Sequence, residues 1–125
     1  MKLNELRDEV GTWARSNFGP GTEGGYHALL GMVEEMGELS HHHLKQLQNI
    51  RKNEDHEEGI KDAIGDILIY MADYASMRGY DLDKILDDTW NEIVKKRDWK
   101  LNSTDGKVAP TPVPADHTCC NCEKE

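Results

Sequence analysis

Apolar residues recur at intervals of three and four positions in four blocks along this chain. This spacing places them on one face of an α-helix, which completes a turn in about 3.6 residues. No stretch of the sequence alternates strictly between apolar and polar residues, as a half-buried β-strand would. The pattern therefore predicts an all-α fold, with helices over residues 3–17, 26–50, 57–78 and 82–98.

Polar and helix-breaking segments separate these predicted helices. Residues 18–25 contain four glycines and Pro20, and residues 51–57 are wholly polar. Gly79 followed by Asp81 is typical of a helix that ends at a glycine and of a new N-cap directly after it. Four helices of this length can close a four-helix bundle.

The third predicted helix is apolar around most of its circumference between Ile64 and Ala72. A helix of this kind is usually buried on several sides. We therefore expect a homodimer or homotetramer with this helix at its centre, and the alternative is the central helix of a monomer.

The C-terminal part of the sequence has a different composition. Three of the four prolines lie within residues 110–114, and no helical period continues beyond residue 101. We expect one domain over residues 1–101 and a flexible tail over 102–125. The three cysteines all lie in this tail, so disulfides between them cannot link the helices. The tail has four possible zinc ligands, but they are too crowded in sequence to favour a zinc site: His117, Cys119, Cys120 and Cys122.

The charge balance narrows the possible functions. Fifteen Lys and Arg residues against 24 Asp and Glu residues give a net charge of −9, which argues against nucleic acid as a general partner. No apolar run is long enough to span a bilayer, and the N-terminus lacks the hydrophobic block of a signal peptide. We therefore expect a soluble, cytoplasmic protein without a membrane partner.

Carboxylates interrupt the apolar faces of two predicted helices. Glu34, Glu35 and Glu38 lie within a little more than one turn of the second helix, and the third carries an acidic stripe at intervals of four, namely Glu58, Asp62 and Asp66. Asp66 stands in the most apolar segment of the chain, where an unpaired carboxylate is costly. Lys45, Lys95 or Arg97 could pair with it from another helix.

Two facing acidic stripes would enclose a site that offers only oxygen ligands, which favours Mg²⁺, with Mn²⁺ as a possible substitute. A solvated acidic face is the alternative. Glu38 and His41 match the Glu-x-x-His spacing of di-iron sites, but the third helix has no second copy, which disfavours di-iron. His41, His42 and His43 diverge by about 100° each on a helix, so we expect that they cannot share one ion and that at most one faces the acidic site.

The motif Glu34-Glu35-x-x-Glu38, followed by the segment 61–70 with Asp62 and Asp66, resembles the all-α nucleoside triphosphate pyrophosphohydrolases of the MazG type. The resemblance covers residues of about 26 to 99. One departure concerns the Glu-x-x-Asp motif of the family, because Ala63 occupies its first position and the acid is displaced to Asp62.

The resemblance implies a Mg²⁺-dependent enzyme that hydrolyses nucleoside triphosphates to the monophosphate and pyrophosphate. Glu35, Glu38 and Asp66 would bind the metal, with Asp62 as a replacement ligand or a neighbour of the ligands, and Glu34 would orient or deprotonate the attacking water. The residues implied for the substrate are Lys45, Lys95, Lys96 and Arg97 for phosphate, Tyr70 for the sugar and Trp13 for the base.

Several alternatives stay open at this point. The basic cluster at residues 95–97 also suits the C-terminal dipole of its helix. Tyr70 and Trp13 could be core residues. The chain could be a dimeric enzyme similar to the all-α dUTPases, or a helical interaction module without catalytic activity.

Overall fold

The computed structural model describes residues 2–20 and 26–97, and every regular element in these ranges is helical. The elements are α1 (Leu3–Phe18), α2 (Tyr26–Gln48), α3 (His56–Arg78), α4 (Leu82–Asp87) and a π-helix, η2 (Asp88–Val94). The predicted all-α class is therefore confirmed. The predicted tail over residues 102–125, with its cysteines, lies outside the described residues.

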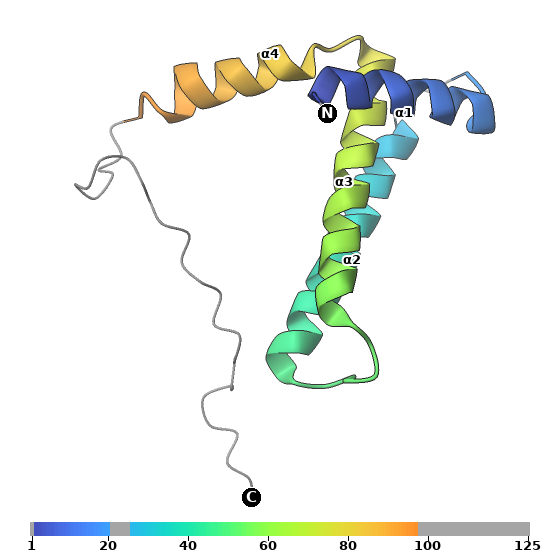
Figure 1. Ribbon diagram of the computed structural model, residues 1–125, viewed down its shortest axis with the longest axis vertical. Helices are drawn as coiled ribbons and strands as arrows, with labels where there is room; N and C mark the ends of the chain where they lie inside the picture. Colours follow the sequence, from blue (N-terminus) through green and yellow to red (C-terminus); the bar gives the residue numbers. More distant parts are fainter. Residues whose placement is uncertain (1, 21–25, 98–125) are drawn as a thin grey trace, which may run out of the picture.

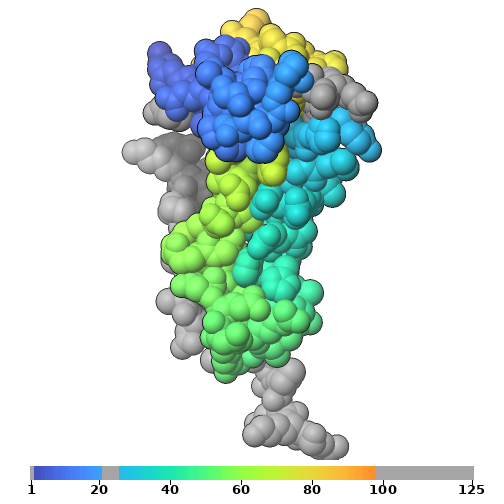
Figure 2. Space-filling model, turned by 90° about the vertical axis from the view of Figure 1, so that its right-hand side faces the viewer, coloured from blue at the N-terminus to red at the C-terminus, as the bar shows by residue number. Residues whose placement is uncertain are grey.

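The longest helices, α2 and α3, form an antiparallel pair joined by the loop at residues 49–55 (Figure 1). Helix α1 lies across the end of this pair where α2 begins and α3 ends, as Figure 2 also shows. Helix α4 starts beside the N-terminal part of α1, and η2 continues it away from α2 and α3 (Figure 1). The single chain thus pairs α2 with α3 under α1, and its fourth helical segment does not close a bundle around them.

Three of the predicted helix boundaries follow from local chemistry. Gly79 adopts the left-handed conformation with φ of 67° and ends α3. Asp81 is the N-cap of α4 and accepts a hydrogen bond from the backbone N–H of Lys84 at 2.9 Å. Helix α2 ends at Gln48, two residues before the predicted end, because Asn49 takes φ of 54° and closes a Schellman-type turn.

The predicted single helix over residues 82–98 is wrong in its detail. The α-helical part ends at Asp87, and η2 follows, with the backbone N–H of Lys95 donating to the carbonyl of Trp90 at 2.9 Å. This i→i+5 bond is the pattern of a π-helix, which widens the turn and shifts every later side chain around the helix axis.

Small residues make the contacts between the helices. The buried apolar side chains among the described residues are all alanines, namely Ala14, Ala28, Ala63, Ala72 and Ala75, and Gly11 and Gly31 are also buried. Large apolar residues that the sequence assigns to a core, such as Val33 at 69% exposure, stay open to solvent in the single chain. None of the described helices combines the length and the apolarity that crossing a membrane requires.

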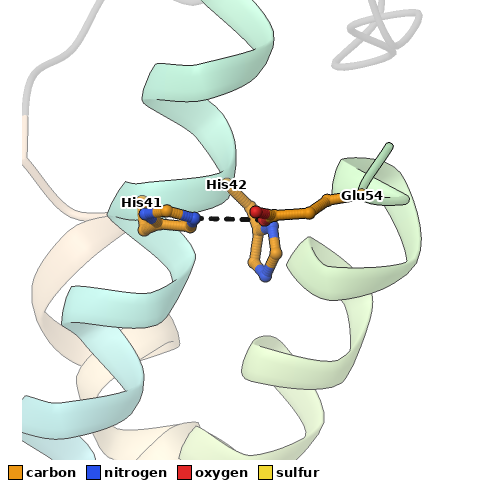
Figure 3. Close-up of side chains that lie close together, drawn as sticks. All are labelled: His41, His42 and Glu54. Carbon is orange, nitrogen blue, oxygen red and sulfur yellow. Dashed lines mark hydrogen bonds and ion pairs between the residues drawn. The ribbon is translucent and has the colours of Figure 1, made fainter. Parts of the chain in front are cut away.

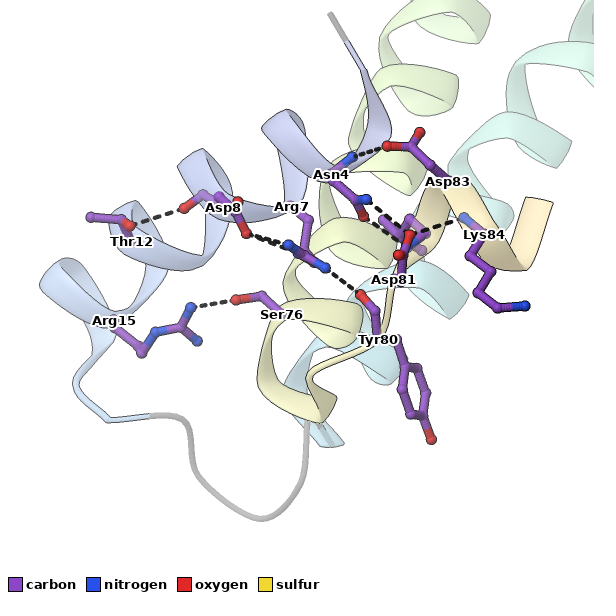
Figure 4. A network of polar contacts seen from close by, with 11 residues as sticks. Asn4, Arg7, Asp8, Thr12, Arg15, Ser76, Tyr80, Asp81, Asp83 and Lys84 are labelled. Carbon is purple, nitrogen blue, oxygen red and sulfur yellow. Dashed lines mark hydrogen bonds and ion pairs between the residues drawn. The ribbon is translucent and has the colours of Figure 1, made fainter. Parts of the chain in front are cut away.

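Helices α1 and α4 cap each other across about eighty residues of sequence (Figure 4). The carboxylate of Asp83 accepts from the backbone N–H groups of Leu3 at 3.2 Å and Asn4 at 3.3 Å. In return, the side chain of Asn4 accepts from the backbone N–H of Leu82 at 2.8 Å and donates to Asp81 at 2.9 Å. Each helix therefore satisfies N–H groups that the other leaves free.

Candidate functional site

A cavity of about 650 Å³ lies where α1 meets the N-terminal half of α2 and the C-terminal half of α3. Its walls combine carboxylates, aromatic rings and one guanidinium. The lining includes Trp13, Arg15, Phe18, His27, Glu34, Glu35, Asp66, Ile69, Tyr70 and Asp73. Five of the residues that the sequence assigns to catalysis, metal or substrate thus share one cavity: Trp13, Glu34, Glu35, Asp66 and Tyr70.

Glu35 occupies the centre of the acidic group. Partial burial raises the pKa of the Glu35 carboxyl above its ordinary value of 4.5, and the negative charges of its neighbours raise that pKa further, in the order Asp66, Glu38, Glu34 and Asp62. Glu38 and Asp62 do not line the cavity, yet their charges reach Glu35. Glu34 and the three other predicted metal residues therefore all act electrostatically on Glu35, and Asp62 and Asp66 do so from the neighbouring helix α3.

Asp66 is half-buried, and its carboxylate makes no hydrogen bond or ion pair with any residue in the ranges that the structure describes. Lys45 donates instead to Gln48 at 3.3 Å, so this possible partner from α2 is engaged elsewhere. The donor set around Glu35 consists of carboxylates, which is the chemistry that suits a hard cation. No three carboxylates of this group have oxygen atoms all within 4.8 Å of one another in the described part of the chain, so binding an ion there requires side-chain rotation.

Tyr70 follows Asp66 by one turn of α3 and rests on Gly31 of α2. A methyl group at Gly31 would overlap the tyrosine ring, so the glycine makes this contact possible. Partial burial, and then the charges of Glu34, Glu35 and Asp66, raise the pKa of the Tyr70 hydroxyl above 10.0. Tyr70 is therefore a neutral hydroxyl beside the acidic group and lines the cavity.

Helix α1 supplies the aromatic wall of the cavity. Trp13 is 55% exposed and meets Phe18 edge to face, with ring centroids 5.6 Å apart. This exposure excludes the interpretation of Trp13 as a core residue within the single chain.

Two charged lining residues, Arg15 and Asp73, were missed by the sequence analysis. Arg15 donates to the hydroxyl of Ser76 and its guanidinium lies at the cavity, and partial burial raises the pKa of Asp73. Arg15 lies on a polar part of α1, and only the crossing of α1 over α3 brings it to the site.

The basic cluster after η2 is not part of this cavity. Lys95 lies over the ring of Trp90 at 5.8 Å from its centroid, and Lys96 pairs with Glu92. Neither these residues nor Arg97 line the cavity, and neither does Lys45. Among the described residues that line the cavity, the side chains that carry or can gain a positive charge are Arg15 and His27.

The histidine tract forms a second polar group at the other end of the α2–α3 pair (Figure 3). His41 and His42 both approach Glu54 of the loop, and one ligand atom of each of the three residues lies within 4.8 Å of the others. Ligand atoms of two successive histidines thus come close together despite the expected divergence of about 100° per residue, because both side chains reach toward Glu54 of the loop. That successive histidines cannot share one ion stays a prediction. His43 is exposed and takes no part.

No protein-family model, curated protein sequence or solved structure matches this chain.

Proposed function

We propose that this protein hydrolyses (deoxy)nucleoside triphosphates to the monophosphate and pyrophosphate, with Mg²⁺ as its cofactor. The observation that carries the proposal is the single cavity in which the carboxylates of Glu34, Glu35 and Asp66 lie opposite the aromatic side chains of α1. Its volume of about 650 Å³ lies within the range typical of small-molecule sites. The motif resemblance suggests the reaction, and we propose that it takes place in this cavity.

The acidic residues have separate roles in this proposal. Glu35 and Asp66, with Glu38 and the displaced acid Asp62 beside them, would hold the metal. Bound Mg²⁺ supplies positive charge for the phosphate oxygens and makes a water molecule more acidic. Glu34 has an exposed carboxylate at the cavity, where it can accept a proton from the water that attacks phosphorus.

The remaining lining residues suit the rest of a nucleotide. The exposed faces of Trp13 and Phe18 can stack on a base, and the hydroxyl of Tyr70 can hydrogen-bond to the sugar. Arg15 lines the same cavity, so its guanidinium can stabilise the negative charge of the leaving pyrophosphate. In this proposal, the basic residues 95–97 reach phosphate only from a second copy of the chain.

We also propose that the protein is a homodimer or a higher homo-oligomer. Apolar side chains at intervals of four and three form an exposed stripe on each long helix: Leu29, Val33 and Met36 on α2, and Ile64, Leu68 and Met71 on α3. Exposed apolar stripes of this length favour association, because burying each large side chain gains about 1.5–3 kcal/mol.

The experiment that tests the activity is a panel of ribo- and deoxyribonucleoside triphosphates, incubated with the protein and Mg²⁺, with products separated by ion-exchange chromatography. We expect monophosphate and pyrophosphate in equal amounts, and no turnover when EDTA replaces Mg²⁺. Diphosphate and phosphate as products would indicate a different phosphohydrolase. An absence of turnover with every nucleotide would favour the interaction module.

A further inference from the structure

We propose a second metal site, for a zinc-like transition metal ion, at the end of the α2–α3 pair far from α1. Its ligands would be His41 Nε2, His42 Nδ1, His56 Nδ1 and a carboxylate oxygen of Glu54. Three structural elements contribute. His41 and His42 come from α2 and Glu54 from the loop (Figure 3), and His56 is the first residue of α3. The bound ion would link α2 to α3 at the loop that connects them.

The spacing of the donor atoms fits a tetrahedral ion. Metal–ligand bonds of 2.0–2.2 Å place tetrahedral donors about 3.4 Å from one another. Here Glu54 Oε2 lies 3.3 Å from His41 Nε2 and 4.0 Å from His56 Nδ1, and His56 Nδ1 lies 3.1 Å from His42 Nδ1. His41, His42 and Glu54 thus already have ligand atoms within 4.8 Å of one another. His56 lies outside this group of three and would complete the site by a side-chain movement toward the ion.

The hydrogen bonds around the group identify which imidazole nitrogens can bind. His56 Nε2 lies 3.1 Å from the backbone oxygen of Ile50, which can only accept, so the proton of neutral His56 is on Nε2 and its Nδ1 has a free lone pair. The Nδ1–H of His42 then donates to that lone pair. A histidine that binds a metal typically donates its other N–H to a carbonyl in this way.

The second nitrogen of His42 also has a suitable neighbour. His42 Nε2 lies 3.8 Å from a carboxylate oxygen of Glu38, so the proton can move to Nε2 and face this carboxylate when Nδ1 binds the ion. Binding therefore needs no imidazole to turn over. A second proton must also move, because His41 Nε2 donates to the Glu54 carboxylate; this proton would pass to Nδ1 of His41 or to solvent when Nε2 binds the ion.

Burial and charge at the group also suit a cation. His56 is buried, and the side chain of His42 is only 12% exposed, so their ring orientations are fixed by packing. The carboxylate of Glu54 lies 3.3 Å from His41 Nε2 and supplies a negative charge among the imidazoles. Imidazole nitrogens with one carboxylate select Zn²⁺ and similar ions over Mg²⁺, which prefers oxygen donors. The site is thus chemically distinct from the acidic group around Glu35.

Gly59 makes room for the His42 ring. A methyl group at Gly59 would overlap three atoms of this imidazole, whereas a methyl group at Gly65 of the same helix would meet nothing within 4 Å. The two glycines therefore offer a matched pair of alanine substitutions. Only one of them disturbs the proposed site, and neither removes a ligand.

The test is a calorimetric titration of the full chain with Zn²⁺ in excess Mg²⁺, which occupies the acidic group. The parent protein for this titration is the full chain with Cys119→Ser, Cys120→Ser and Cys122→Ser, because the cysteine thiols could themselves bind Zn²⁺. We expect one Zn²⁺ per chain, an affinity at least tenfold lower in His41→Gln and in Glu54→Gln, and unchanged affinity in His43→Gln and Asp66→Asn.

A second set of measurements does not depend on removing a ligand. Gly59→Ala should also weaken Zn²⁺ binding at least tenfold, and Gly65→Ala should bind like the parent. Circular dichroism of each variant without metal checks that it is folded. Absence of Zn²⁺ binding by the parent, equal affinity in the ligand variants, or a loss in Asp66→Asn equal to that in His41→Gln would each overturn the proposal. None of these results depends on nucleotide hydrolysis.

Discussion

Asp66 is a half-buried carboxylate next to Glu35, and no basic side chain of the described residues pairs with it. Replacing it by the neutral isostere Asn should leave the metal-free protein at least as stable, because repulsion with Glu35 is removed. If Asp66 binds Mg²⁺, Asp66→Asn should also abolish turnover and shrink the rise in melting temperature that Mg²⁺ causes. Thermal melts with and without Mg²⁺, beside the turnover assay, measure both effects.

Asp62→Asn, measured in parallel, distinguishes a ligand from a neighbour of the ligands. A loss of activity as large as for Asp66→Asn would identify Asp62 as a ligand, and a mild loss would place it outside the ligand set. Glu9→Gln, on the exposed side of α1, serves as the control. Full activity in Asp66→Asn would contradict the proposed acidic site.

The raised pKa of Glu35 predicts a specific dependence of stability on pH. The folded protein retains the Glu35 proton at pH values where the unfolded chain, with its pKa of 4.5, has lost it. This contribution to stability is therefore complete below pH 4.5 and is lost as the pH rises through the folded pKa. Without metal, Glu35→Gln should become more stable than the wild type as the pH rises from 4.5 toward neutrality. Urea unfolding over a pH series measures the difference, and a constant difference would count against this account.

Gly31 and Gly37 of α2 provide a matched test of the contact with Tyr70. A methyl group at Gly31 would overlap the tyrosine ring, whereas one at Gly37 would meet nothing within 4 Å. Gly31→Ala should destabilise the protein by about 1–3 kcal/mol, because the contact is overpacked. Gly37→Ala should stabilise it by up to about 1 kcal/mol through helix propensity. Chemical unfolding of both variants checks the pair, and a neutral Gly31→Ala would show that Tyr70 can move aside without cost.

At the scale of the helices, features fixed by neighbouring residues could be predicted from the sequence, and features that depend on how helices cross could not. Gly79 and Asp81 end one helix and begin the next through their own backbone and side-chain chemistry, so the sequence was sufficient there. The contact of Gly31 with Tyr70 and the position of Arg15 depend on how α1, α2 and α3 cross. Helical periodicity does not specify these crossings. The position of Arg15, and the common cavity of Trp13 with the acidic residues, therefore required the structure.

The reciprocal caps of α1 and α4 should be measurable as one coupled unit. Asn4→Ala removes the acceptor of the Leu82 N–H, and Asp83→Ala removes the acceptor of two N–H groups of α1. We expect each substitution to cost about 1 kcal/mol, with the double variant differing from the sum, because both act at one junction. Denaturant unfolding gives the free energies of unfolding of the two single variants and the double variant.

Asn17→Ala, at an exposed position of the same helix, is the control and should change stability by less than about 0.5 kcal/mol. A double variant whose loss of stability equals the sum of the two single losses would contradict the coupling.

At the scale of the whole molecule, the described part of the chain fully buries alanines and glycines and leaves many of its larger apolar residues exposed. The sequence predicted the apolar faces and favoured a second copy of the chain over the same chain as their cover; the oligomer stays a prediction. We expect Val33→Glu to convert the proposed oligomer into monomers, because a charge in a buried interface is costly. Sedimentation velocity measures the mass, with Thr12→Glu on α1 as the control. A monomeric wild type would contradict the proposed assembly.

The mutual capping of α1 and α4 also has a consequence for how the protein emerges from the ribosome. The backbone N–H groups of Leu3 and Asn4 find their acceptor only in Asp83, about eighty residues later in translation. The α2–α3 pair, whose contacts are nearer in sequence, can assemble before that point. Helix α1 therefore gains these two acceptors only after α2 and α3 have been synthesised, although it precedes both of them in the chain.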